Sequence, residues 1–353
     1  MSQILRNTLA LICVCFFCCG ASAQKSFTVG TATAMPGQKA TGFIEVPAGA
    51  DAALQIPVVV VNGAKPGPVL SIVAGTHGTE YATIIAVERL IHELDPAEIS
   101  GTVILVPLVN VNSFLQKMPH LNPADGKNMN RMFPGKPEGT QTDRASWLIT
   151  KDVVEQSDYL IDMHGGDLDE NLRPYSYWPK SGNPKIDAVT REMVLAFGFD
   201  NIIIFEDRPM DPNNSRYLDN TAITRGKPAI IVEAGFAGNV ETDDVNRIVR
   251  GCLNVMRDRK MLSGEVTPVE NPVWYSKVVT LTSEQTGIFY PLVKRGTYVQ
   301  QGMRIGYVTD LFGKRIEDVR ATDSGVVLFI CAVPSMKKGD NLIDIGVVAA
   351  QAP

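Results

Sequence analysis

The sequence predicts an α/β fold, with a mixed sheet flanked by helices, followed by a small all-β domain at the C-terminus. Two observations support this prediction. Up to about residue 260, short apolar runs typical of buried strands alternate with segments whose apolar residues recur at the helical period of about 3.6. Beyond Gly264 the helical period disappears, and short alternating strands are separated by glycines.

Charge and composition exclude one class of function. The 353 residues carry a formal net charge of -5, and the lysines and arginines form no run. A nucleic-acid-binding surface normally requires a basic excess on one face or segment. We therefore expect no nucleic-acid partner.

The N-terminus has the three parts of a secretory signal peptide. Arg6 supplies a positive charge, Leu9–Cys19 is apolar, and Ala21-Ser22-Ala23 is a small-residue cleavage site. The apolar stretch is too short to span a bilayer, and no later segment reaches spanning length. We predict cleavage near Ala23 and a periplasmic or secreted mature protein without membrane contact.

These features divide the chain into a signal peptide over residues 1–23, a larger domain over residues 24–265 and a C-terminal β domain over residues 266–353. Cleavage would leave only Cys252 and Cys331. Two distant cysteines in apolar settings are more often buried thiols than a disulfide, although an oxidising compartment leaves pairing open.

Strands and helices alternate from the start of the larger domain. Ile56–Val61 is a β-branched strand that we expect to pair beside the buried strand Leu70–Ala74. A helix over Tyr81–Leu94 and a strand over Thr102–Val109 follow. Asn110–Gly139 is long, polar and rich in Pro, Gly and Asn, and a loop of this length is usually functional.

The second half of this domain continues the alternation. Helices are predicted over residues 143–154, 186–197 and 243–260, and strands over residues 159–163, 201–205 and 229–232. His164 and Glu233 directly follow two of these strands. Because ligands of open α/β sheets gather at the carboxyl ends of strands, both residues are candidates for a site.

His77 and Glu80 lie three residues apart, between the strand Leu70–Ala74 and the helix that follows it. An imidazole and a carboxylate at this spacing can converge on one metal ion. With His164 they would form a catalytic zinc set that keeps one position for water, and Glu233 would remain as the base for that water. The competing interpretation is that all four are ordinary polar residues at a sheet edge.

Three more residues have two interpretations each. Asp162 shares a strand face with His164 and could orient that imidazole, or it could be an unrelated buried carboxylate. In the long loop, Arg131 could bind a carboxylate in a bidentate manner and Asn130 could add amide hydrogen bonds. Taken alone, Arg131 is more typical of a surface turn.

Other candidates carry less weight. His92 lies within a predicted helix and is typical of a solvent-facing side chain, whereas His120 lies in the long loop and could touch a substrate. Tyr290 or Tyr298 could reach the site from the β domain, although such tyrosines more often belong to a core.

Four motifs occur in a fixed order: His77-Gly78-Thr79-Glu80, Asn130-Arg131 with Phe133-Pro134-Gly135, Asp162-Met163-His164 and Glu233-Ala234-Gly235. Their order and spacing resemble the succinylglutamate desuccinylase/aspartoacylase family, a branch of the zinc-carboxypeptidase fold. The resemblance runs from about Gly42 to the C-terminus, where Gly287-Ile288-Phe289, Gly302 and Gly325 are similar to that family's β domain.

The resemblance implies a zinc-carboxypeptidase-like sheet and one zinc ion per chain, held by His77, Glu80 and His164. It implies that Glu233 promotes attack by zinc-activated water, and that Asn130 and Arg131 hold the substrate carboxylate. The expected activity is hydrolysis of the amide bond of an N-acyl amino acid or a similar small molecule. An oligomer is possible.

The chain also departs from the family pattern. Where some members carry a further arginine for the acyl carboxylate, this chain has Gln116, Lys117 and His120, which weakens the case for a succinyl or aspartyl group. Export favours scavenged or cell-wall-derived amides. Alternatives on the same metal site are a metallocarboxypeptidase acting on exported or cell-wall peptides, a related ester hydrolase, and a binding protein without catalysis. The presence of Glu233 argues against the last.

Overall fold

The computed structural model describes residues 24–353, so the predicted signal peptide over residues 1–23 lies outside the described residues. The first eleven strands are β1 (Phe27–Val29), β2 (Ala32–Ala34), β3 (Gln38–Val46), β4 (Leu54–Asn62), β5 (Lys65–Ala74), β6 (Ser100–Val106), β7 (Tyr159–His164), β8 (Glu170–Leu172), β9 (Tyr175–Pro179), β10 (Asn201–Phe205) and β11 (Ala229–Glu233). The helices are α1 (Tyr81–Glu93), α2 (Val111–Gln116), α3 (Gln141–Ile149), α4 (Pro184–Phe197), α5 (Leu218–Ile223) and α6 (Thr242–Asp258). Short 3-10 and π-helical turns cover Met129–Arg131 and Thr150–Val154.

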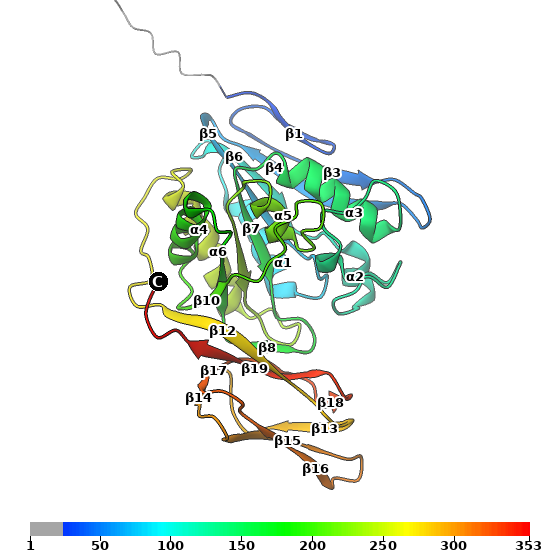
Figure 1. Ribbon diagram of the computed structural model, residues 1–353. Coiled ribbons are helices and arrows are strands. Elements are labelled where there is room, and N and C mark those ends of the chain that lie inside the picture. The colour runs from blue at the N-terminus through cyan, green and yellow to red at the C-terminus, as the bar shows by residue number, and fades with distance from the viewer. Residues whose placement is uncertain (1–23) are drawn as a thin grey trace, which may run out of the picture.

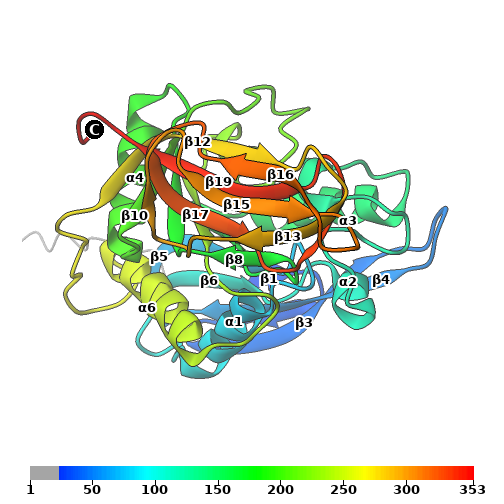
Figure 2. The same cartoon turned by 90° about the horizontal axis from the view of Figure 1, so that it is seen from below.

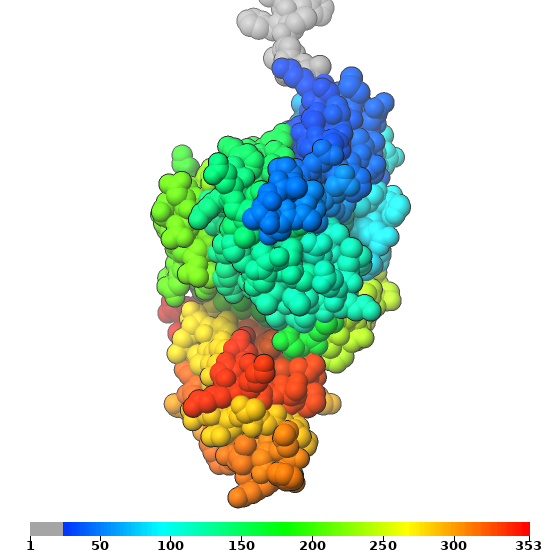
Figure 3. Space-filling model, turned by 90° about the vertical axis from the view of Figure 1, so that its right-hand side faces the viewer, coloured from blue at the N-terminus to red at the C-terminus, as the bar shows by residue number. Residues whose placement is uncertain are grey.

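The C-terminal part is built of strands. They are β12 (Val273–Thr282), β13 (Gly287–Pro291), β14 (Tyr298–Val299), β15 (Arg304–Thr309), β16 (Arg315–Arg320), β17 (Gly325–Cys331), β18 (Ser335–Met336) and β19 (Asn341–Val348). In Figure 3 this part, yellow to red, forms a narrower lobe below the blue-to-green part of the chain. The predicted boundary between residues 265 and 266 falls between α6 and β12, and it stays a prediction.

One mixed sheet of 13 strands runs through both parts (Figure 1), in the order β14-β17-β19-β12-β10-β9-β11-β7-β5-β6-β4-β3, with β8 paired to β17. Strands β13, β15, β16 and β18 form a separate antiparallel sheet. This arrangement confirms the predicted fold class, a mixed sheet with helices and a small antiparallel sheet at the C-terminus.

Helices cover both faces of the larger part because its strands present apolar side chains to both sides. Leu70 and Ile72 of β5 face the core beneath α1, α4 and α6. Val73 faces the opposite core, beneath α3 and α5. Helices α1 and α6 lie side by side on the first face (Figure 2).

Two expectations about the sheet were wrong or incomplete. Strand β4 does not pair with β5, because β6 lies between them, antiparallel to β4 and parallel to β5. The crossover through α1 returns the chain next to β5, and β4 then occupies the outer side of β6. Strand β9 was not predicted, because it has only five residues, follows Pro174 directly and ends in Pro179. Proline is unusual within strands.

The C-terminal strands continue the large sheet. Strand β12 pairs in parallel with β10, with Trp274 opposite Ile202, and β19 pairs with β12 in the antiparallel sense. A third apolar core joins these strands to the small sheet, with Tyr275, Phe289 and Ile345 fully or almost fully buried. Cys252 and Cys331 are buried free thiols, as expected. Among residues 24–353, no helix has the length and apolarity needed to cross a bilayer.

Candidate metal and substrate site

The site begins where β5 gives way to α1. Gly75 has a φ of +67°, and a Cβ there would lie 2.9 Å from the Cα of Leu108, so this turn requires glycine. The turn carries His77 and Glu80 out of the strand, and Glu80 is the residue preceding the first turn of α1. The Nδ1 atom of His77 lies 2.7 Å from Oε1 of Glu80.

His164 reaches the same carboxylate from the end of β7, the neighbour of β5 in the sheet. Its Nδ1 atom lies 3.1 Å from Oε2 of Glu80. The candidate ligand atoms of His77, Glu80 and His164 all lie within 4.8 Å of one another, and all three residues are buried. The structure therefore brings together the three predicted metal ligands.

The outer nitrogens of both imidazoles lie next to polar side chains. Nε2 of His77 lies 3.2 Å from Oδ1 of Asn128, and Nε2 of His164 lies 3.1 Å from both Oδ1 of Asp162 and Nδ2 of Asn130. A hydrogen donated outward from Nε2 leaves the Nδ1 lone pair free to bind an ion beside Glu80. Asp162 is therefore placed where it can orient His164, and Asn128, to which the sequence assigned no role, does the same for His77.

The charges of the cluster favour a cation. Burial alone would raise the pKa of Glu80, but His164 and His77 outweigh it and hold that pKa well below its usual range. Burial would lower the pKa of His164, yet Asp162 and Glu80 raise it well above its ordinary value. Two inward-facing imidazole nitrogens and one carboxylate are the donor set of a catalytic zinc site, so these residues fit zinc.

His120 lies beside the metal cluster and contacts two carboxylates. It forms ion pairs with Asp167 at 3.3 Å and Asp169 at 3.1 Å. Burial lowers the pKa of His120, but the hydrogen bond to Asp169 and the nearby charges of Asp167, Glu170 and Asp169 raise it to about 9. A protonated imidazole is a poor metal ligand, so the grouping of His77, His120 and Asp167 is less suited to an ion than the first cluster.

Glu233 ends β11 directly opposite His164 of β7. Burial raises the pKa of its carboxyl well above the usual value, and Glu80, Glu170 and Asp162 add to this while His164 opposes it. Within residues 24–353 no side chain forms an ion pair or hydrogen bond with this carboxylate. Glu233 is therefore available to exchange a proton with a ligand in the cavity.

A cavity of about 620 Å³ contains these groups and extends to two arginines. Arg131 and Arg208 approach the ring of Tyr217 at 4.9 and 3.7 Å from its centre. Arg208 also lies 3.5 Å from Asp219, whereas Nη1 of Arg131 donates to the backbone oxygen of Asn130. The two guanidinium groups make this end of the cavity suited to binding a carboxylate.

Asn130 joins the loop to the metal cluster. Its Oδ1 atom accepts a hydrogen bond from the backbone of Leu218, and its Nδ2 atom lies 3.1 Å from Nε2 of His164. Asn130 is almost fully buried, so the loop that carries Arg131 is fixed against β7 and α5. Arg208 was missed by sequence reasoning, although it closely follows β10 and the strand-end rule could have found it.

The C-terminal strands form one wall of the cavity. Phe329, Cys331 and Asp344 line it. Tyr290 and Tyr298, the two predicted candidates from this part, do not line it. Tyr290 stacks on Tyr307, and both Tyr290 and Tyr298 are exposed.

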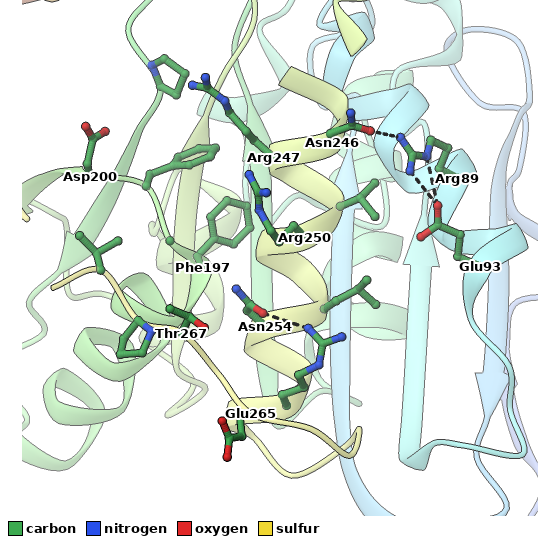
Figure 4. A pocket seen from close by; sticks show the side chains of 18 of the residues that line it. Arg89, Glu93, Phe197, Asp200, Asn246, Arg247, Arg250, Asn254, Glu265 and Thr267 are labelled. Carbon is green, nitrogen blue, oxygen red and sulfur yellow. Dashed lines mark hydrogen bonds and ion pairs between the residues drawn. The ribbon is translucent and has the colours of Figure 1, made fainter. Parts of the chain in front are cut away.

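A larger groove, of about 1040 Å³, lies elsewhere along α6 (Figure 4). Arginines 89, 173, 247, 250 and 257 are among the residues that line it. It contains no histidine or cysteine, and none of the candidate site residues. The chemistry assembled around His77 is therefore confined to the smaller cavity.

Comparisons with known proteins agree with this geometry. The profile described as succinylglutamate desuccinylase/aspartoacylase catalytic domain matches residues 66–259, more than half of the chain. The chain is 29% identical over 318 residues to an N-alpha-acetyl-L-2,4-diaminobutyric acid deacetylase from Halomonas elongata, covering 87% of this chain and 91% of that protein.

Solved structures share the fold. A succinylglutamate desuccinylase from Silicibacter sp. matches with a TM-score of 0.80 and 24% identity, over 88% of this chain and 95% of that one. The product-bound ectoine utilization protein EutE (DoeB) from Ruegeria pomeroyi matches with a TM-score of 0.79 and 23% identity, over 88% and 95%. An aspartoacylase family protein from Mesorhizobium loti has a TM-score of 0.77 and 26% identity, over 93% and 99%. The chain thus belongs to the succinylglutamate desuccinylase/aspartoacylase family and is a deacylase of that type.

Proposed function

We propose that the protein is a zinc-dependent hydrolase that removes the acyl group from a small N-acyl amino acid. The observation that carries this proposal is the convergence of the Nδ1 atoms of His77 and His164 on the two oxygens of Glu80, with Glu233 on the adjacent strand end. The Halomonas elongata relative is named for an N-acetyl amino acid substrate, which supports the same substrate class here.

The metal would be held by His77, Glu80 and His164. When bound, zinc polarises a carbonyl oxygen and lowers the pKa of a coordinated water. Asp162 and Asn128 lie beside the outer nitrogens of the two imidazoles, where each can accept the hydrogen that leaves Nδ1 free for the ion.

Glu233 moves the proton. Its carboxylate takes a proton from the attacking water as the water oxygen bonds to the acyl carbon. It then delivers that proton to the amide nitrogen as the C–N bond breaks, so the products are a carboxylic acid and a free amino acid. A raised pKa suits this role, because a base that must also act as an acid is most effective near the working pH.

Arg131 and Asn130 position the substrate. Arg131 forms no ion pair with any carboxylate of the described chain, so its guanidinium can bind the carboxylate of the amino acid. Arg208 stacks on the same tyrosine and strengthens the positive potential at this end of the cavity.

The activity is tested by measuring amine release from N-acetyl amino acids, N-succinyl amino acids and unblocked dipeptides, with zinc-loaded protein. We expect release from the N-acyl amino acids and its loss in Glu233→Gln. Release confined to peptides with a free amino group would instead identify a metallocarboxypeptidase. Faster cleavage of the matching esters would identify an ester hydrolase.

We also propose that the protein is exported, from the signal-like segment at residues 1–23. Expression of the full chain in a Gram-negative host, followed by fractionation and N-terminal sequencing, tests this. The expected result is a periplasmic or secreted protein that begins at Gln24. An uncleaved chain in the cytoplasm would refute it.

A further inference from the structure

Strand β19 of the C-terminal part places a carboxylate in the wall of the cavity. Asp344 lies opposite Thr280 of β12, and both Asp344 and Phe329 of the neighbouring β17 line the cavity. The Oδ1 atom of Asp344 is buried and has no hydrogen-bond partner within the described chain. A buried polar atom without a partner is costly, so an unpartnered carboxylate oxygen in the wall of a cavity requires an explanation, and a ligand is one.

Each of the other carboxylates in the cavity has a hydrogen-bond or ionic partner, or a proposed catalytic role. Asp169 contacts His120, Glu170 accepts from the backbone of Asp167, and Asp340 accepts from the backbone of Lys337. Glu80 contacts both candidate metal-binding histidines, Asp219 lies near Arg208, and Glu233 is the proposed base. Asp344 has neither a charged partner nor a backbone donor among the described residues, and the hydroxyl of Thr280 is its neighbour.

The cavity as a whole has an excess of acidic groups. Seven carboxylates line it, against two arginines, no lysine and one histidine outside the metal cluster, His120, whose pKa is raised to about 9. A ligand that brings its own positive charge would reduce this excess.

Asp344 lies in the same region as the proposed chemistry. Burial raises the pKa of Tyr177, and the charges of Glu233 and Asp344 raise it further while Arg208 opposes them, so all three groups act on one phenol. Burial also raises the pKa of Asp344 to about 6, against the hydroxyl of Thr280. The carboxyl therefore still ionises at neutral pH and presents a poorly compensated charge.

We propose that Asp344 binds an ammonium group on the amino-acid part of the substrate, so that the enzyme selects N-acyl amino acids with a cationic side chain. This inference rests on the proposed deacylase function. The substrate carboxylate would bind Arg131, and the side-chain ammonium would bind the Asp344 wall. Strand β19 would thereby set the substrate class, although the catalytic groups lie on other strands.

The test compares two substrates of equal shape, Nα-acetyl-L-2,4-diaminobutyrate and Nα-acetyl-L-norvaline, which differ by an ammonium in place of a methyl group. The full chain should show a higher kcat/KM for the cationic substrate. Asp344→Asn should lower that kcat/KM about 10- to 100-fold and leave the norvaline derivative almost unaffected. Asp340→Asn, which removes an exposed carboxylate from the same wall, should leave the ratio of the two unchanged.

Equilibrium binding separates this inference from the proposed function. Calorimetry on Glu233→Gln, with and without Asp344→Asn, measures the preference for the cationic ligand without turnover. A preference that disappears with Asp344→Asn supports the inference. Equal binding of both ligands, or a preference that survives Asp344→Asn, overturns it. Failure of the unsubstituted protein to release amine from any N-acyl amino acid would overturn the proposed function instead.

Discussion

Replacing Asp162 with Asn should weaken zinc binding, because the carboxylate holds two buried groups at once. Its Oδ1 atom lies 3.1 Å from Nε2 of His164, and its Oδ2 atom accepts a hydrogen bond of 3.2 Å from the backbone of Asp219. An asparagine cannot serve both positions. Either its NH₂ faces the backbone N–H of Asp219, or it faces His164 and removes the acceptor that orients the imidazole.

The expected loss of zinc affinity follows from removing the contact between Asp162 and His164. Removal of such a partner typically weakens metal binding by about 10- to 100-fold, or about 1.4 to 2.8 kcal/mol. Competition for zinc with a chromophoric chelator at neutral pH measures the change. Asp244→Asn is the control, because Asp244 is also buried but lies on α6 and does not line the cavity. An Asp162→Asn protein that keeps its circular dichroism spectrum and binds zinc within about twofold of the unsubstituted protein would refute the assignment.

Three further predictions follow from the same geometry. Arg131→Ala should raise KM about 10- to 100-fold and lower kcat less, because the guanidinium binds the carboxylate in ground and transition states alike; an unchanged KM in steady-state assays would exclude this role. Removing zinc with a chelator should abolish amine release. It should also lower Tm by ~6 °C, relative to protein measured with free zinc at about a thousand times its Kd. An unchanged melting curve would contradict binding at His77 and Glu80. The pKa of Asp344 is raised from 3.8 to about 6, so the folded state binds the extra proton and the free energy of unfolding should fall as pH rises through this window. Denaturant titrations should show a loss of about 1 to 3 kcal/mol that is absent in Asp344→Asn, and equal slopes in both proteins would refute the shift.

The sequence was informative where local pattern and chemistry coincide. The strands ending at His164 and Glu233 and the helix after Glu80 could be predicted, because apolar runs and periodicity mark them directly. Those predictions brought the three candidate metal ligands to one edge of the sheet. The order of the strands in the sheet could not be predicted, because nothing in the local sequence shows that β6 lies between β4 and β5.

Residues recruited over long sequence distances were the hardest to foresee. Arg208 lies in the loop between β10 and α5, where it lines the cavity and stacks on Tyr217. Asp344 looked like one of many alternating residues of a β domain, because its role depends on which face of β19 meets the cavity. The sequence offered Tyr290 and Tyr298 as weaker candidates from this domain, and neither of them lines the cavity.

The pairing of β12 with β10 has a consequence for how the molecule unfolds. Because the C-terminal strands complete the large sheet, a chain truncated after α6 would expose β10 as an unprotected edge strand. Such an edge offers free backbone groups to other chains and promotes aggregation. The two parts should therefore melt in one cooperative transition, and a shortened form containing every catalytic group should be poorly soluble.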